Sequence, residues 1–150
     1  MIIRDILNMK GGAIFSAAPA ERVADAVRLM VQHDIGSLVV LEGERMTGML
    51  TFREVLKALD AGGGDLGALR LRDVMVGDPL CGSPADTLEQ VREAMIRNHA
   101  RYLPVLEEGK LLGVISFHDI AKAVIRQTSF ENRLLKRYIE SQPAGGDAPA

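Results

Sequence analysis

Two pairs of side chains in this 150-residue chain have the types and spacing needed to bind a polar ligand. Ser116 and Asp119 stand where an apolar run ends and a helical pattern begins. A hydroxyl and the free N–H groups of a helix start can hold an anion, and a carboxylate one turn later can accept hydrogen bonds from a cis-diol. Thr51 and Glu54 show the same spacing earlier in the chain.

The same spacing has a structural interpretation. A Ser or Thr followed three residues later by an acid forms a capping box, in which both side chains satisfy backbone N–H groups at the start of a helix. Glu54 is one methylene longer than Asp119, so a diol site built for Asp would be displaced in the first pair. Arg53 could compensate there by pairing with a phosphate. On the residues alone, ligand binding and capping both stay open.

The elements that position these pairs come from an internal duplication. Residues 19–58 align with residues 84–123 without a gap, and eleven of the 40 aligned positions are identical. Self-similarity of this kind marks a repeated structural unit, and two copies are too few for a solenoid. We therefore expect the two copies to pack against each other, joined by a flexible glycine-rich connector at residues 62–67.

Each copy is predicted to contain a short strand, a helix, a hairpin and a second helix, which makes the fold class α/β of the α+β type. Apolar residues at helical spacing predict the first helix, with Pro19 or Pro84 in its first turn and Ser83 as the N-cap in the second copy. Two β-rich runs joined by a polar turn predict the hairpin. The predicted strands are residues 13–16, 37–41 and 46–51, and then 80–82, 102–106 and 110–116.

Short helices are predicted at both ends of the duplication. Isoleucines at residues 2, 3 and 6 favour an amphipathic N-terminal helix. The spacing of Thr128 and Glu131 matches a capping box and predicts a break before a separate last helix, whose apolar face needs cover from the domain or a second subunit. We therefore divide the chain into repeat one with the N-terminal helix (1–61), a linker (62–70), repeat two (71–127), a C-terminal helix (128–140) and a disordered tail (141–150).

Composition and charge argue against several classes of protein. A net charge of −2 and a pI near 5.9 supply no general attraction for nucleic acid. The single cysteine and three histidines show no spacing typical of a metal site, and no common catalytic or phosphate-loop motif occurs. No signal peptide and no apolar run of about 20 residues is visible. We expect a cytoplasmic, non-catalytic protein without a metal, a nucleic-acid partner or a membrane partner.

The second copy resembles the CBS-domain signature. Its residues Gly113-Val114-Ile115-Ser116-Phe117-His118-Asp119 are similar to the family pattern of glycine, two aliphatics, Ser or Thr, two variable positions and Asp. Leu103-Pro104-Val105 is similar to the tripeptide that precedes it in the family. The first copy, Gly48-Met49-Leu50-Thr51-Phe52-Arg53-Glu54, resembles the same signature with Glu in place of Asp. The resemblance covers residues 8–140.

This resemblance implies a pseudo-twofold module, often a disc-like homodimer, that binds adenosyl nucleotides in clefts between its repeats. Ligands in the family include AMP, ADP, ATP, NAD(H) and S-adenosylmethionine. The family pattern implies that the Ser or Thr contacts phosphate and that the Asp binds ribose hydroxyls. It also implies that the module reports the ligand to an effector protein, which this sequence does not identify.

In the family each cleft joins the signature of one repeat to the leading strand and pre-strand turn of the other. The resemblance thus implies a main cleft formed by Ser116, His118, Asp119, Ile14, Phe15, Ser16, Ile35, Gly36 and Ser37. It implies a second cleft formed by Thr51, Arg53, Glu54, Leu80, Cys81, His99, Ala100, Arg101 and Tyr102. Given the resemblance, we favour binding at Ser116 and Asp119 and capping at Thr51 and Glu54.

The function predicted from the sequence is a regulatory module that responds to an adenosyl nucleotide. A constitutive dimerisation or scaffold module is the first alternative, and the Glu in the first signature favours it. A small enzyme that uses NAD(H) or ATP is the second alternative, and it lacks visible catalytic residues.

Overall fold

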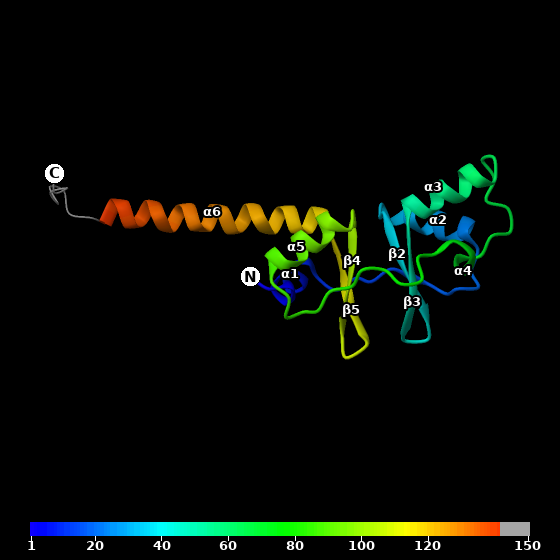
Figure 1. Cartoon of the computed structure of the whole chain (residues 1–150), viewed down its shortest axis with the longest axis horizontal. Coiled ribbons are helices and arrows are strands. Elements are labelled where there is room, and N and C mark those ends of the chain that lie inside the picture. The colour runs from blue at the N-terminus through cyan, green and yellow to red at the C-terminus, as the bar shows by residue number, and fades with distance from the viewer. Residues whose placement is uncertain (142–150) are drawn as a thin grey trace.

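The computed structural model describes residues 1–141, and the tail predicted for residues 142–150 lies outside the described residues. Two small sheets stand side by side (Figure 1). In the first sheet β1 (Ser16–Ala17) pairs parallel with β2 (Ser37–Glu42), and β2 pairs antiparallel with β3 (Arg45–Thr51). The second sheet is the antiparallel pair of β4 (Tyr102–Glu107) and β5 (Lys110–Ser116).

Helices flank each sheet on the side away from the other sheet (Figure 1). Beside the first sheet lie α2 (Val23–His33), α3 (Phe52–Ala61) and α4 (Leu71–Val74). Beside the second lie α1 (Ile3–Lys10), α5 (Leu88–Arg97) and α6 (Phe117–Ser141). Each amphipathic helix is stabilised by burial of its apolar stripe against a sheet or a neighbouring helix.

The duplication is visible in the register of the hairpins. Ser37 pairs with Thr51 in the first, and Tyr102 pairs with Ser116 in the second, each shifted by the same offset as the sequence repeats. Both hairpins carry an irregularity at equivalent places, between Val40 and Leu41 and between Val105 and Leu106. The predicted fold class, two repeats of mixed helix and strand, is confirmed.

The chain crosses between the two cores. Ile3 and Ile6 of the N-terminal helix α1 are buried in the core of the second repeat, together with residues of α5, β4, β5 and α6. Leu71 of α4, which follows the connector, is buried in the core of the first repeat. The segment before the first repeat therefore completes the core of the second, and the segment before the second repeat completes the core of the first. The proposed domain boundaries stay a prediction.

The C-terminal region differs from the prediction. The expected break at Thr128 does not occur, because α6 runs without interruption from Phe117 to Ser141. Residues 128–131 contain no Pro or Gly that would end a helix, and Gln127 and Glu131 bond through their side chains along it. A capping-box spacing is also compatible with a helix interior, so the spacing alone could not fix a boundary.

Two further local predictions were wrong. Thr87, not Ser83, caps α5, since its hydroxyl accepts a hydrogen bond from Gln90 N at 3.1 Å. Ser83 instead begins the preceding turn, where its N–H donates to Asp86 at 2.8 Å. The leading strand of the second copy is reduced to one bridge, between Gly82 and Val105.

Candidate functional site

Thr51 and Glu54 form a capping box where β3 passes into α3. One Glu54 oxygen accepts hydrogen bonds from the Thr51 backbone N–H at 3.1 Å and from the Thr51 hydroxyl at 2.9 Å. The side chain of Glu54 is buried, and these bonds satisfy one of its two carboxylate oxygens. Thr51 and Glu54 therefore cap the N-terminus of α3, as the sequence predicted.

Ser116 and Asp119 make the equivalent arrangement at the start of α6. The Ser116 hydroxyl accepts from the Asp119 N–H at 3.1 Å, and Asp119 Oδ2 accepts from the Ser116 N–H at 2.9 Å. The same Oδ2 also accepts from Lys10 Nζ at 2.7 Å, and Lys10 donates as well to the Val114 carbonyl at 2.7 Å. The carboxylate of the better-matching signature is thus already paired with a cation from α1.

This pairing changes the acidity of Asp119. Burial raises the pKa of the Asp119 carboxyl, but the hydrogen bonds from Lys10 and Ser116 and the charge of Lys10 outweigh burial and hold the pKa below its ordinary value. The Asp119 side chain is only 15% exposed, so the ion pair is largely shielded from water. A ribose diol that approached this carboxylate would have to compete with Lys10.

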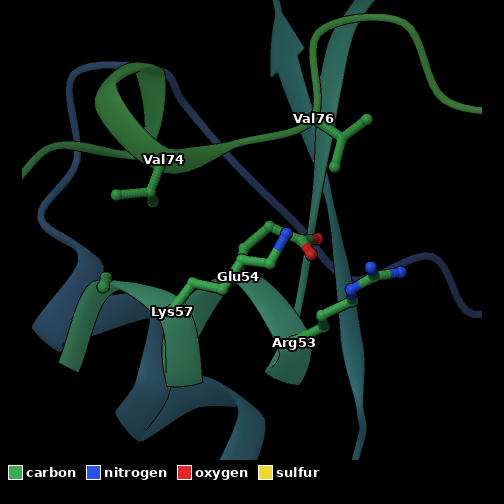
Figure 2. A pocket seen from close by; sticks show the side chains of 6 residues that line it. Arg53, Glu54, Lys57, Val74 and Val76 are labelled. Carbon is green, nitrogen blue, oxygen red and sulfur yellow. The ribbon is translucent and has the colours of Figure 1, made fainter. Parts of the chain in front are cut away.

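A large cleft lies between the repeats on the side of Thr51 and Glu54. Its volume is about 880 Å³, within the range of small-molecule sites. A smaller hollow of about 490 Å³ shares Arg53, Glu54, Lys57 and Val76 with it. In Figure 2, Glu54 and Lys57 extend from α3 toward Val76, and the Arg53 guanidinium lies on the other side of the Glu54 carboxylate. The large cleft is lined by Met49, Thr51, Phe52, Arg53, Glu54, Leu56, Lys57, Val76, Asp78, Pro79, Leu80, Met95, Ile96, Asn98, His99, Ala100, Arg101, Tyr102 and Phe117.

The cleft combines flat apolar surfaces with positive charge. Arg101 of the second repeat lies over the ring of Phe52 of the first, with its guanidinium carbon 5.3 Å from the ring centre. Phe52 also meets the ring of Tyr102 edge-on at 6.3 Å. Arg53 and Lys57 add two further cations, against the carboxylates of Glu54 and Asp78. Aromatic faces can stack a base and the guanidinium groups can bind phosphate.

The two repeats are in close contact at Gly36. A Cβ atom at this position would lie 1.9 Å from the Tyr102 hydroxyl and 3.2 Å from a ring carbon of Phe52. Burial raises the pKa of Tyr102, and the charge of Arg101 opposes this only in part, so the hydroxyl stays a hydrogen-bond donor at neutral pH. Because Gly36 has no side chain, the ring of Tyr102 can pack against the backbone of the first repeat at this position.

The structure gathers the predicted residues of the second cleft. Thr51, Arg53, Glu54, Leu80, His99, Ala100, Arg101 and Tyr102 all line it. Cys81 is not among the lining residues: its thiol is exposed and donates to the Pro79 carbonyl at 3.3 Å. Burial, followed by the charge of Asp78, raises the pKa of Cys81, which keeps it a neutral thiol.

The residues predicted for the main cleft are spread over both repeats. Phe15 packs on the His33 ring at 4.5 Å, and its carbonyl accepts from Val39 in the first sheet. Gly36 accepts from the Phe52 N–H at the strand end. Within residues 1–141 no hydrogen bond joins the group Ile14, Phe15, Ser16, Ile35, Gly36 and Ser37 to the group Ser116, His118 and Asp119. These residues stay a predicted site.

Four residues that matter here were not predicted from the sequence. Phe52, Phe117 and Lys57 line the cleft, and Lys10 pairs with Asp119. A signal existed for three of them, because Phe52 and Phe117 are an identical pair in the duplication and Lys57 matches Lys122. Lys10 lies outside the aligned copies, so only the packing of α1 on the second repeat reveals it.

Neither a metal centre nor a membrane-spanning helix is found among residues 1–141. No three His, Cys, Asp or Glu side chains among residues 1–141 are arranged to hold a metal ion. None of the helices in the same range combines the length and apolar character that crossing a bilayer requires.

Comparison with known proteins identifies both repeats. The sequence model of the CBS domain matches residues 3–61 and 71–126. The CBS domain-containing protein YhcV of Bacillus subtilis is 30% identical over 108 residues, which are 72% of this chain and 76% of YhcV. The crystal structure of the CBS-domain protein ATU1752 from Agrobacterium tumefaciens superposes with a TM-score of 0.75 at 29% identity, covering 82% of this chain and 98% of that one.

Two further matches are a solved CBS domain pair with low sequence identity and a larger enzyme of which this chain covers only a part. The CBS domain pair of protein MJ0100, solved with 5′-methylthioadenosine and S-adenosyl-L-methionine, has a TM-score of 0.74, with 85% of this chain and 98% of that one covered. At 17% identity that likeness concerns the fold alone. The inosine-5′-monophosphate dehydrogenase of Korarchaeum cryptofilum is 32% identical over 120 residues, 79% of this chain, which spans only 22% of the enzyme.

Proposed function

The chain belongs to the CBS-domain family, and on that premise we propose that it is a regulatory module that binds an adenosyl nucleotide between its repeats. CBS-domain pairs are generally regulatory and not catalytic, and the dehydrogenase match covers only a small part of that enzyme. The observation that carries the proposal is the cleft of about 880 Å³ in which Arg101 of one repeat lies over Phe52 of the other. We propose AMP, ADP, ATP, NAD(H) and S-adenosylmethionine as candidate ligands.

We propose that the ligand occupies the cleft of Thr51, Arg53, Glu54 and Arg101 first. Three Arg or Lys side chains line this cleft, and its aromatic rings offer faces for a base. The sequence favoured the other cleft, at Ser116 and Asp119. The ion pair of Asp119 with Lys10 supports binding at the cleft of Thr51 and Arg101 first, since a diol at Asp119 must displace the Lys10 ammonium. We propose one nucleotide per chain in the native protein.

The proposed signal is a change in how the two repeats are arranged. A ligand that touches both repeats favours the arrangement that it binds more tightly, and only by that difference in affinity. Arg101 and Phe52 come from different repeats, so a phosphate and a base held by them would join the repeats. We further propose that the protein acts in the cytoplasm, as a homodimer that reports to a protein effector.

Thermal unfolding with added ligand tests this function. We expect millimolar AMP, ATP, NADH or S-adenosylmethionine to raise the melting temperature, because a ligand at about 100 times its Kd stabilises by about 2.7 kcal/mol. The same samples are assayed for turnover of the added nucleotide, and we expect none. The absence of any shift would support the scaffold alternative, and turnover would support the enzyme alternative.

A further inference from the structure

The hollow of about 490 Å³ beside α3 adjoins the large cleft between the repeats. The two share four lining residues: Arg53, Glu54, Lys57 and Val76. In Figure 2 the side chain of Val74 points toward α3 from the segment on the opposite side of the hollow. The shared residues therefore lie where the hollow meets the cleft, and a long ligand can pass them to reach both.

The part of the hollow beyond the shared residues is apolar. Among residues 1–141, only Ala58 and Val74 line the hollow without also lining the cleft. The two cations of the hollow, Arg53 and Lys57, are thus both at the junction. A phosphate placed beyond the junction would lose its water without gaining a partner, whereas a ring would cover the apolar wall. The hollow therefore suits a base, and the junction suits a phosphate.

Glu54 offers a hydrogen-bond acceptor at this junction. The residue is only 9% exposed, and one of its carboxylate oxygens accepts both bonds from Thr51. Within residues 1–141 no hydrogen bond reaches the other oxygen. A mostly buried acceptor without a partner favours a ligand that brings a donor, and a ribose hydroxyl is such a donor.

We propose that the cleft and the hollow together bind a dinucleotide, in which a pyrophosphate joins two nucleosides. One base packs on the aromatic rings of the cleft, the pyrophosphate meets Arg53 and Lys57, and the second nucleoside lies in the hollow against Val74. This inference rests on the nucleotide cleft of the proposed function and selects among its candidate ligands. AMP, ADP or ATP would leave Ala58 and Val74 uncovered, and S-adenosylmethionine would bring a positive charge beside Arg53 and Lys57.

Calorimetric titration of NADH and of ADP into the full chain tests the second nucleoside. ADP has the same adenosine and pyrophosphate with more negative charge, so tighter binding of NADH must come from its other half. The native chain is expected to bind NADH about 10-fold or more tightly than ADP. Val74→Phe fills the hollow and is expected to weaken NADH binding to the level of ADP, with ADP binding unchanged. Val31→Phe adds the same ring on α2, where the native side chain is 76% exposed, and is expected to change neither affinity.

The outcomes separate this inference from the proposed function. NADH binding no tighter than ADP binding, or an equal loss of both in Val74→Phe, would overturn the dinucleotide and leave the nucleotide cleft in place. Binding of neither ligand by the native chain would contradict the proposed function itself.

The fluorescence of bound NADH tests the hollow in the native chain, whether or not Val74→Phe folds. The emission maximum of the reduced nicotinamide is expected to move to shorter wavelength, because Ala58 and Val74 shield the ring from water. An unshifted maximum from bound NADH would place the ring in solvent and overturn the proposal.

Discussion

At the scale of single residues, Lys10 joins three elements. It is the last residue of α1, and its ammonium bonds to Val114 of β5 and to Asp119 at the start of α6. The pKa of Asp119 lies below its ordinary value because these bonds favour the charged carboxylate. A carboxylate with a lowered pKa in the folded state stabilises that state at all pH values above the unfolded pKa.

Asp119→Asn is expected to lower the free energy of unfolding at neutral pH by about 1 kcal/mol, the scale of a lost helix cap. The difference from the native protein is expected to persist above the unfolded pKa of 3.8 and to vanish as the pH falls through the lower folded pKa. Urea unfolding between acid and neutral pH measures it. Asp25→Asn, an exposed carboxylate on α2, is the control, and an equal effect in both variants would contradict the role of Lys10.

Lys10 is also expected to set the number of ligands. If its ion pair keeps a diol from Asp119, the native chain binds one nucleotide and Lys10→Ala binds two, by calorimetric titration with ATP. Lys122→Ala removes an exposed lysine of α6 and is expected to leave the stoichiometry at one. Two sites in the native chain, or one site in Lys10→Ala, would show that Lys10 does not block the second cleft.

At the scale of elements, the ends of β2 and β4 bring the repeats into contact. Gly36 precedes β2, and the Tyr102 hydroxyl occupies the space that a side chain at Gly36 would need. Tyr102 begins β4 and contacts Phe52, the first residue of α3. The wall of the cleft between the repeats therefore depends on a contact between a glycine of one repeat and a tyrosine of the other.

Gly36→Ala is expected to displace Tyr102, to cost about 1–3 kcal/mol of stability as an overpacked contact, and to weaken ATP binding. Denaturant unfolding and calorimetry measure the two effects. Gly77→Ala is the matched control, because a Cβ there meets nothing within 4 Å. If Gly36→Ala were as stable as the control and bound ATP equally well, the contact would not support the cleft.

Local sequence patterns predicted most elements because the chain encodes them twice, once in each repeat. The four hairpin strands, α2, α3 and α5 follow from apolar spacing and from turns such as Gly43 and Gly109, whose φ angles are positive. Helix ends were harder, since Ser83, Thr87 and Thr128 all have capping chemistry and only the surrounding packing selects among them. The Lys10 ion pair could not be predicted, because it joins positions 109 residues apart.

At the scale of the whole molecule, the two repeats are held together by exchanged segments. Ile3 is fully buried in the core of the second repeat, and Leu71 is fully buried in the core of the first. Figure 1 shows the chain passing from one sheet to the other between α1 and α2 and again between α4 and α5. A change in the relative position of the repeats must therefore move both connecting segments.

The exchanged segments predict which repeat is destabilised when Ile3 or Leu71 is truncated. Ile3→Ala is expected to cost about 2–5 kcal/mol, as for other truncations of fully buried side chains, and to raise amide exchange in β4 and β5. Leu71→Ala is expected to raise exchange in β2 and β3 instead. Hydrogen exchange followed by mass spectrometry measures both. If Ile3→Ala loosened the first repeat more than the second, the assignment of the cores would be contradicted.

Calorimetric titration of ATP into the native chain and into Arg101→Ala tests the central claim most directly. The proposed cleft predicts binding by the native protein and affinity about 10-fold or more weaker without the Arg101 guanidinium, a loss of ~1.4 kcal/mol or more. Arg28→Ala removes an exposed arginine of α2 and is expected to bind as the native chain does. No binding at millimolar ATP, or equal loss in both variants, would contradict a nucleotide site between the repeats.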